Sequence, residues 1–503
     1  MRIPRSPDGP GVNLPRRDFL KTAGALAPAM LGAAREKRPN VLFIIADEWR
    51  AQSTGYNGDA NVHTPVLDRL ARESVSFDNA VSGCSVCCPA RASIMTGQYP
   101  LTNGVFINDV ELKPNAPTLA ECFAKAGYRT GYIGKWHLYG SPDGKYGRRL
   151  AYIPPDKRLG FDYWKACECS HDYNHSLYYE DNDPTPRYWP GYDASSQTDD
   201  AIRFIGDRAH ANDPFFLFLS LGPPHFPYET APAEYRAMYQ TREIKLRPNV
   251  PAEKRAEADK ILRGYYAHMA ALDDCFDRLL KALDERKIAE DTIVVFTSDH
   301  GDMMLSQGLT TKLYPWDESV RIPFLLRYPA RFGRKGRRVS APLNMPDMMP
   351  TLLSLAGIAV PEGVQGRDFS RAAAGAAAEE PDAAALISLP VPITEARRYG
   401  FAEYRGLRTL RYTYVRSIKG PWLLYDNRED PYQMHNLCNR SEAKLIQAAL
   451  DNKLNSRLRA IRDDFLPARE YVARARLGHY REVNIPVGHT KSPWGDWEST
   501  ASA

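Results

Sequence analysis

The chain has 503 residues, and its 66 Lys and Arg residues nearly balance its 61 Asp and Glu residues, which leaves a formal net charge of +5. This small excess excludes a histone-like protein and one with an acidic tail. With 43% hydrophobic and 25% charged residues, the composition is that of an ordinary globular protein with about two or three domains, which excludes disordered and fibrous classes. Its 8 cysteines are too few for a disulfide scaffold.

The N-terminal segment carries the charge excess, because residues 1–40 contain 8 basic and 3 acidic side chains. An arginine pair, Arg16-Arg17, stands before a weakly apolar run that ends in small residues at Ala34 and is too short to span a bilayer. This arrangement resembles a bacterial twin-arginine signal. We therefore expect residues 1–34 to direct export through the twin-arginine machinery, to the periplasm or outside the cell. No other run is apolar enough for a transmembrane helix, so no stable membrane anchor is expected.

Five continuous apolar runs are typical of strands buried on both faces of a parallel sheet. They alternate with segments of helical periodicity, the first of which opens with Thr64 as N-cap and Pro65 at the first helical position. This alternation predicts an α/β fold with a large, mostly parallel sheet flanked by helices. The expected strands are 40–47, 128–134, 214–221, 292–299 and 322–328. The expected helices are 64–73, 118–126, 198–208, 253–285 and 345–355.

Two irregular segments interrupt this pattern. The stretch 361–385 is rich in alanine, glycine and acidic residues and indicates a linker, whereas 139–195 is rich in Tyr, Trp, His and Asp and indicates an insertion. After the linker, the segments 409–415 and 422–426 predict antiparallel strands, and 441–466 predicts a helix. The expected domains are therefore a larger α/β domain at 35–370 and a smaller α+β domain at 386–503.

Acidic residues stand at the ends of two of the predicted strands. Asp47 and Glu48 close the first strand, and Asp299 and His300 close the strand at 292–299. Because ligand sites of open α/β sheets gather at the carboxyl ends of strands, these side chains are expected to meet. Each pair alone suits a solvated loop or a helix cap. Together they form a set of oxygen donors with one imidazole, which suits a divalent cation.

A cysteine-rich segment runs from Cys84 through Cys87 and Cys88 to Pro89 and Arg91. Pro89 at a first helical position would put Cys87 at or just before a helix N-terminus, where backbone N–H groups favour an anion. Arg91, one turn further on, would face the same negative charge. Three other interpretations stay open from the residues alone: a dithiol redox pair, half of a zinc site, and a plain buried thiol.

The frame Cys87-x-Pro89-x-Arg91, followed by 95–97 (Met-Thr-Gly), resembles the signature of the type I sulfatases, in which the cysteine is oxidised to formylglycine. The similarity spans roughly residues 38–440, too much of the chain for chance. It implies the alkaline phosphatase-like fold and a catalytic role for the larger domain. The other matching segments are 38–48, 131–137, 224–228, 297–301, Lys312 ahead of 321–323, and 424–437.

The resemblance implies a sulfuric ester hydrolase with a divalent metal ion. The implied ligands are Asp47, Glu48, Cys87 as formylglycine, Asp299 and His300. Two of them depart from the family pattern, which usually has Asp in place of Glu48 and often Asn in place of His300. Calcium is the favoured ion, with magnesium or manganese as alternatives because imidazole is a softer donor. A formylglycine-generating enzyme or an anaerobic maturase would be needed to convert Cys87.

The resemblance also implies the roles of the catalytic side chains. These are Cys87, Arg91, Lys135, His137, His225 and Lys312. Arg91 would hold the charge beside the cation, and Lys135 and Lys312 would balance the sulfate. His225 would protonate the leaving alcohol, and His137 would act as the base that releases sulfate.

The insertion at 139–195 is expected to form a lid that selects the substrate, and its aromatic and charged residues suit a sulfated sugar. The residues singled out are His171, Tyr173, His175, Tyr178, Arg187, Tyr188 and Trp189. Ordinary packing of the lid explains any one of them equally well. The alternatives to a glycan sulfatase are a phosphonate monoester or phosphodiester hydrolase of the same superfamily and an inactive relative that only binds. The sequence shows no nucleic-acid motif.

Overall fold

The computed structural model describes residues 38–140, 149–209, 211, 213–375, 383–393, 396–397 and 399–477. The export signal expected at 1–34 lies outside these residues. The chain from Arg38 onward forms one compact unit. Within the described ranges, no helix combines the length and the apolar character needed to cross a bilayer.

The predicted large, mostly parallel sheet is confirmed. The expected strands form as β1 (Asn40–Asp47), β4 (Arg129–Lys135), β8 (Phe215–Pro224), β9 (Thr292–Ser298) and β10 (Phe324–Arg327). The sheet is completed by β2 (Val75–Phe77), β5 (Tyr163–Cys167), β6 (Leu177–Glu180), β7 (Asp183–Tyr188) and β11 (Arg337–Val339). Its strand order is β11-β2-β10-β9-β1-β8-β4-β5-β6-β7. The central strands from β9 to β5 are parallel, whereas β10 is antiparallel to β9.

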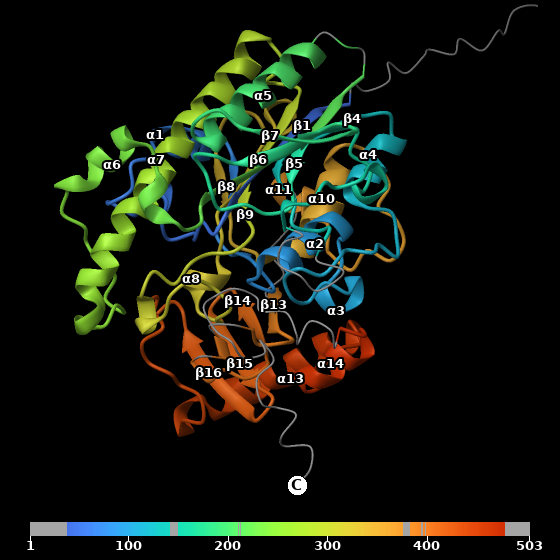
Figure 1. Cartoon of the computed structure of the whole chain (residues 1–503). Coiled ribbons are helices and arrows are strands. Elements are labelled where there is room, and N and C mark those ends of the chain that lie inside the picture. The colour runs from blue at the N-terminus through green and yellow to red at the C-terminus, as the bar shows by residue number, and fades with distance from the viewer. Residues whose placement is uncertain are drawn as a thin grey trace, which may run out of the picture. The chain divides into compact units, whose positions relative to one another are not determined.

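Helices cover both faces of the sheet (Figure 1). The expected helices form as α1 (Pro65–Arg72), α4 (Leu119–Lys125), α5 (Asp193–Arg208), α7 (Arg255–Glu285) and α10 (Met348–Leu355). Leu42 and Ile44 of β1 pack with α1, α5 and α7, whereas Phe43 belongs to the core shared with α4 and α10. Burial on both faces explains why β1 is a continuous apolar run. Further elements are β3 (Ala80–Val81), β12 (Leu343–Asn344), α2 (Cys87–Thr96), α3 (Pro100–Asn103), α6 (Ala233–Gln240), α8 (Asp317–Val320), α9 (Pro329–Phe332) and α11 (Ser370–Ala373).

The N-terminus of α1 is capped from another helix. Thr64 is the N-cap residue, as predicted, but its side chain accepts no capping hydrogen bond. The buried carboxylate of Asp273 on α7 accepts from Val66 N at 2.9 Å and from Leu67 N at 2.8 Å instead. These bonds satisfy two of the N–H groups that a helix start leaves unpaired, and they fix α1 to α7.

The C-terminal part of the chain forms a four-stranded antiparallel sheet, β13 (Ala384–Leu389), β14 (Tyr404–Thr409), β15 (Tyr412–Ser417) and β16 (Gly420–Asp426). The helices α13 (Lys444–Ala460) and α14 (Ala468–Arg474) follow it. The expected strand at 409–415 starts late, because Thr409 Oγ1 accepts from Tyr412 N at 2.8 Å in the turn between β14 and β15. β13 begins inside the expected linker, and Ser388 N donates to Gly83 O at 2.7 Å, which ties this sheet to the segment between β3 and α2. The division into two domains stays a prediction.

The insertion at 139–195 contains regular structure that its weak periodicity did not predict. β5 continues the parallel part of the large sheet beside β4, and β6 and β7 extend it in antiparallel fashion. β7 is the edge strand, and five of its six residues are exposed. Its two prolines suit an edge strand, because the N–H group that proline lacks is not needed for a hydrogen bond to a neighbouring strand on the open side.

Candidate functional site

The predicted site residues come from neighbouring strands of the large sheet. Asp47 is the last residue of β1 and Lys135 the last of β4. Asp299 directly follows β9, and His225 directly follows β8. Because β9, β1, β8 and β4 are adjacent and parallel, their carboxyl ends bring these side chains to one edge of the sheet.

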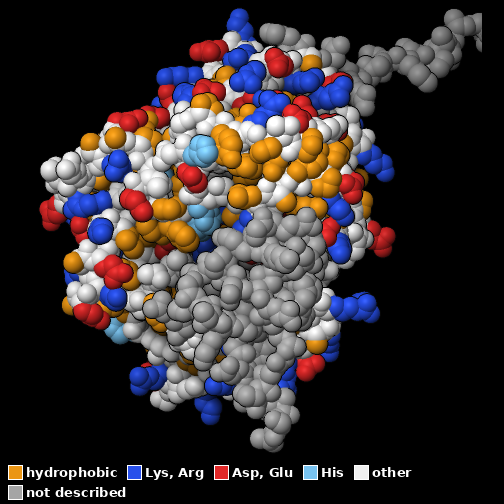
Figure 2. All heavy atoms as spheres, in the orientation of Figure 1, with side chains coloured by type: hydrophobic (Ala, Val, Ile, Leu, Met, Phe, Trp, Pro, Cys, Tyr) orange, Lys and Arg blue, Asp and Glu red, His pale blue; other side chains and the backbone are white. Residues whose placement is uncertain are grey.

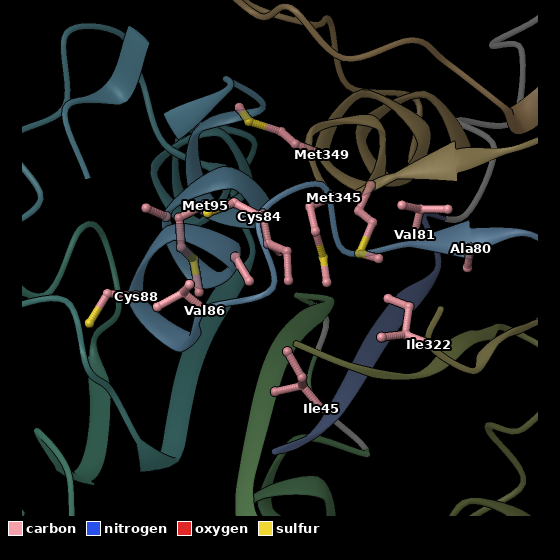
Figure 3. Close-up of a cluster of buried hydrophobic side chains, with 14 of the residues drawn as sticks. Ile45, Ala80, Val81, Cys84, Val86, Cys88, Met95, Ile322, Met345 and Met349 are labelled. Carbon is pink, nitrogen blue, oxygen red and sulfur yellow. The ribbon is translucent and has the colours of Figure 1, made fainter. Parts of the chain in front are cut away.

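Cys87 is the first residue of α2, and Val86 is the N-cap. The prediction that Cys87 lies at a helix N-terminus is therefore confirmed, although Pro89 occupies the third helical position instead of the first. All ten residues of α2 are buried. Figure 3 shows apolar side chains around this helix, with Met345 and Met349 beside the Met95 face. This packing fixes the position from which the Cys87 side chain leaves the helix.

Four side chains form a buried group that could hold a metal ion: Asp47, Cys87, Asp299 and His300. Their ligand atoms all lie within 4.8 Å of one another. Ligand oxygens of calcium lie 2.3–2.6 Å from the ion, so two ligands on opposite sides are about 5 Å apart. The group therefore has the size of a single-ion site. The thiol of Cys87 stands here for the oxygen that a hydrated formylglycine would present.

The donors of this group are oriented for an ion. His300 Nδ1 lies 3.0 Å from Gly301 O, which keeps a proton on Nδ1 and leaves Nε2 as a ligand atom. Nε2 is 3.2 Å from Cys87 Sγ. Asp299 Oδ1 accepts from Glu48 N at 3.1 Å and from His300 N at 3.0 Å, which fixes that carboxylate.

Glu48 lies next to this group and not within it. Its Oε1 is 3.2 Å from Lys312 Nζ and its Oε2 is 3.2 Å from His225 Nε2. Neither contact has hydrogen-bond geometry. Burial raises the pKa of Glu48 well above its ordinary value. Its assignment as a metal ligand stays a prediction.

Arg91 joins the carboxylates of Asp47 and Asp299. Its Nε donates to Asp299 Oδ2 at 3.1 Å, and its Nη2 lies 3.4 Å from Asp47 Oδ2. Nη1 donates to Ser220 Oγ at 2.7 Å and to Lys135 O at 3.1 Å. Sequence reasoning missed Ser220, although a lone hydroxyl within the apolar run of β8 was a visible signal.

The charged side chains of the site shift one another's pKa values. Burial alone would raise the pKa of Asp47, but Lys135, His225 and Arg91 together hold it well below its ordinary value. Burial likewise opposes the charge on Lys135, and the contact with Asp47 raises the pKa of that lysine well above its usual range. Asp47 is therefore ionised and Lys135 protonated, as a ligand and an anion-binding cation should be.

His225 and Lys312 form a second cluster beside the first. Lys312 Nζ lies 2.7 Å from His225 Nε2, and the ring of His171 stacks on His225 with centroids 4.2 Å apart. Burial, Lys312 and His171 lower the pKa of His225 well below its ordinary value. Tyr173 OH donates to Phe226 O at 3.1 Å and so supports the His225 segment. Two residues of the expected lid, His171 and Tyr173, thus adjoin the site.

The other residues singled out in the insertion lie in β6 and β7 or directly beside these strands. His175 stacks on Tyr188 and Tyr178 stacks on Trp189, each with ring centroids 4.0 Å apart. Figure 2 shows hydrophobic side chains gathered over this region with histidine beside them. Tyr188 is 49% exposed. Arg187 is engaged by Glu180 and Asp183.

His137 is buried and contacts a carboxylate that sequence reasoning missed. Its Nε2 lies 3.3 Å from Asp109 Oδ1, and Arg149 binds the same carboxylate through two nitrogens. Asp109 lies in an irregular segment with no motif, so no sequence signal marked it.

The fold and this site define an α/β protein with a buried cysteine, an ion-sized group of possible ligands and several cations at the strand ends. The Sulfatase family model matches residues 39–358, and a model for the C-terminal part of N-sulphoglucosamine sulphohydrolase matches residues 306–460. The chain therefore belongs to the sulfatase family. The predicted family, its fold and the enzyme class are confirmed.

Several relatives resemble the chain over most of its length. An ulvan-active sulfatase of Formosa agariphila is 42% identical over 463 residues, which are 92% of this chain and 87% of that protein. An endo-4-O-sulfatase of Bacteroides thetaiotaomicron is 30% identical, covering 88% of this chain and 95% of the relative. The solved structure of yidJ from Bacteroides fragilis, a protein assigned to the sulfatases, has a TM-score of 0.78 and 31% identity, covering 87% of this chain and 98% of that one.

Proposed function

We propose that the protein is an exported sulfatase that hydrolyses sulfate esters of a glycan, with Cys87 converted to formylglycine. The observation that carries this proposal is the convergence of Cys87 with Asp47, Asp299 and His300 in one buried, ion-sized group. Asp47, Asp299 and His300 would hold a divalent cation that neutralises sulfate oxygens, and the formylglycine made from Cys87 would supply, once hydrated, the hydroxyl for attack on sulfur. The oxygen-rich ligands favour calcium, with magnesium or manganese as alternatives.

The side chains around the group suit the binding and proton transfers of this reaction. Lys135 and Lys312 place two cations where the sulfate charge would spread. His225 would protonate the leaving oxygen through Nε2, the ring nitrogen that lies 2.7 Å from Lys312 Nζ. His137 would accept a proton when sulfate is released.

Maturation and export require other proteins. A formylglycine-generating enzyme or an anaerobic maturase would oxidise Cys87, and the twin-arginine machinery would recognise the segment 1–34. We also propose that residues 35–370 form the catalytic domain and residues 386–503 the C-terminal domain.

Two observations support a glycan as the substrate. The relatives include sulfatases named for ulvan and for an endo-4-O position. The stacked pair His175 and Tyr188 is exposed, and aromatic faces of this kind stack on sugar rings. His175 is four residues from His171, whose ring stacks on His225, the proposed acid. The Cα atoms of His175 and His171 are therefore at most about 14 Å apart.

Replacing Tyr188 by alanine tests the glycan surface. We expect kcat/KM for sulfated ulvan oligosaccharides to fall roughly 3- to 10-fold, because one ring contact contributes about 0.5–1.5 kcal/mol. The loss for nitrophenyl sulfate should be smaller, since that substrate has no sugar ring to stack on Tyr188. Leu445→Ala, on the exposed surface of α13, is the control. Equal losses for both substrates would show that Tyr188 acts only on the fold.

The proposed function is tested by mass spectrometry of the peptide that contains Cys87, from a host with a formylglycine-generating enzyme. The same preparation is assayed on an aryl sulfate and on an aryl phosphonate. Formylglycine with faster sulfate turnover would support the proposal. Much faster phosphonate turnover would favour the phosphonate hydrolase instead. Unmodified cysteine with no hydrolysis of either ester would indicate an inactive binding relative.

A further inference from the structure

We propose that Asp109, clamped by Arg149, is a positioning residue that fixes His137 in the tautomer with its proton on Nε2. The proposal rests on the proposed function only for the role of His137 as a base. The tautomer itself is a property of the folded chain. It would leave Nδ1 as the atom of His137 that accepts a proton.

The carboxylate of Asp109 is held by two strong contacts. Arg149 Nε donates to Oδ1 at 2.7 Å and Nη2 donates to Oδ2 at 2.6 Å, the paired geometry in which a guanidinium binds a carboxylate most strongly. Asp109, His137 and Arg149 are all buried. Burial alone would raise the pKa of Asp109, but Arg149 and the bonds to His137 hold it far below its ordinary value. Asp109 is therefore ionised and can only accept hydrogen bonds.

This state of Asp109 decides which nitrogen of His137 carries the proton. His137 Nε2 lies 3.3 Å from Asp109 Oδ1, so the contact is a hydrogen bond only if Nε2 is the donor. Burial, with contributions from Lys135 and Arg149, lowers the pKa of His137 to about 3, so the ring is neutral and has one proton. With that proton on Nε2, Nδ1 has a free lone pair. Among the described residues, Nδ1 is buried and has no hydrogen-bond partner.

The backbone on both sides of this contact is fixed as well. Leu112 N donates to Leu138 O at 2.9 Å, which joins the segment of Asp109 to that of His137. Asp109 N donates to Cys88 Sγ at 3.3 Å, and so connects the carboxylate to the helix that carries Cys87. His137 has a left-handed backbone, with φ of 57°, which side chains disfavour. His137 N donates to Glu168 O at 2.7 Å and helps to hold that conformation.

The tautomer can be measured in protein with unmodified Cys87, which removes any dependence on the reaction. Ring-nitrogen NMR of 15N-histidine-labelled protein distinguishes Nε2–H from Nδ1–H, and His137→Gln identifies the His137 signals by their loss. We expect Nε2–H in the wild-type protein. Wild-type His137 with its proton on Nδ1 would overturn the proposal, whether or not Asp109→Asn folds.

Asp109→Asn tests whether Asp109 is the cause. The side-chain amide of asparagine has one oxygen and one NH₂ group, so its NH₂ group must face either the N–H groups of Arg149 or Nε2 of His137. Neither arrangement favours Nε2–H as the carboxylate does, so we expect the His137 signals to lose the single Nε2–H form. Asp273→Asn is the matched control, because it makes the same change at a buried carboxylate that caps α1, and it should leave the signals unaltered. An unchanged Nε2–H tautomer in folded Asp109→Asn protein would also overturn the proposal.

The matured enzyme gives the functional readout. Asp109→Asn should lower kcat by roughly 10²- to 10⁴-fold with a smaller change in KM, because a positioned general base contributes about that factor. Asp273→Asn should keep the wild-type kcat. A wild-type preparation that contains formylglycine but hydrolyses no sulfate ester would refute the proposed function, whereas the ring spectra would still decide the tautomer.

Discussion

Cys87→Ala is expected to reduce sulfate ester hydrolysis at least about 10⁴-fold, because removing a nucleophile leaves only the residual effect of binding and charge. The fold should survive, since α2 is held by its other nine residues and the change removes a single sulfur atom from a buried position. Hydrolysis of nitrophenyl sulfate measures the first effect. The thermal midpoint of unfolding, within a few degrees of wild type, measures the second.

Cys84→Ala is the matched control for that experiment. Cys84 is a buried free thiol in the loop before α2, so the substitution removes the same atom from a similar environment. We expect it to keep the modification of Cys87 and an activity within a few-fold of wild type. Activity retained by Cys87→Ala, or an equal loss in both variants, would contradict the assignment of Cys87 as the reacting residue.

Asp299→Asn should abolish metal binding and lower activity at least about 10³-fold, because the site loses a negatively charged ligand and the charge stabilisation it gives the ion. The amide would also present an N–H group to Arg91 or to the ion, in place of the carboxylate oxygen that accepts from Arg91 Nε at 3.1 Å. Metal content after dialysis and nitrophenyl sulfate hydrolysis measure the two effects.

Thermal unfolding separates the metal effect from damage to the fold. An ion that binds only the folded protein stabilises it by about 2.7 kcal/mol at 100 times its dissociation constant. Calcium should therefore raise the midpoint of wild-type protein and of Asp273→Asn, and a chelator should reverse the rise. Asp299→Asn should respond to neither. A normal calcium response in Asp299→Asn would show that the ion is bound elsewhere.

The central strands and the ends that carry the site could be predicted from the sequence because their signals are local. The run 40–47 is apolar throughout and then acidic, and β1 has those same bounds. Cys87 was placed at a helix start because Pro89 follows it, and the helix begins there. The C-terminal strands were predicted less well, because the turn after Thr409 depends on a hydroxyl that closes it and not on glycine or proline.

The contacts that orient the site could not be predicted, because they join segments that are remote in the chain. Arg91 meets Ser220 across 129 residues, and Arg149 reaches Asp109 across 40. Neither pair has a characteristic spacing. The position of Glu48 beside Lys312 and His225 also depends on its left-handed backbone, with φ of 68°, which a strand-end pattern does not reveal.

The burial of α2 implies a sequence for the biosynthetic steps that we propose. Cys87 is 2% exposed in the folded chain, and all ten residues of its helix are buried. We therefore expect a maturation enzyme to act on that thiol while the segment is still unfolded. In the proposed pathway, oxidation would come first, folding around the new side chain second, and export of the folded protein last. A purified, folded chain that missed the first step would have to be unfolded before it could be converted.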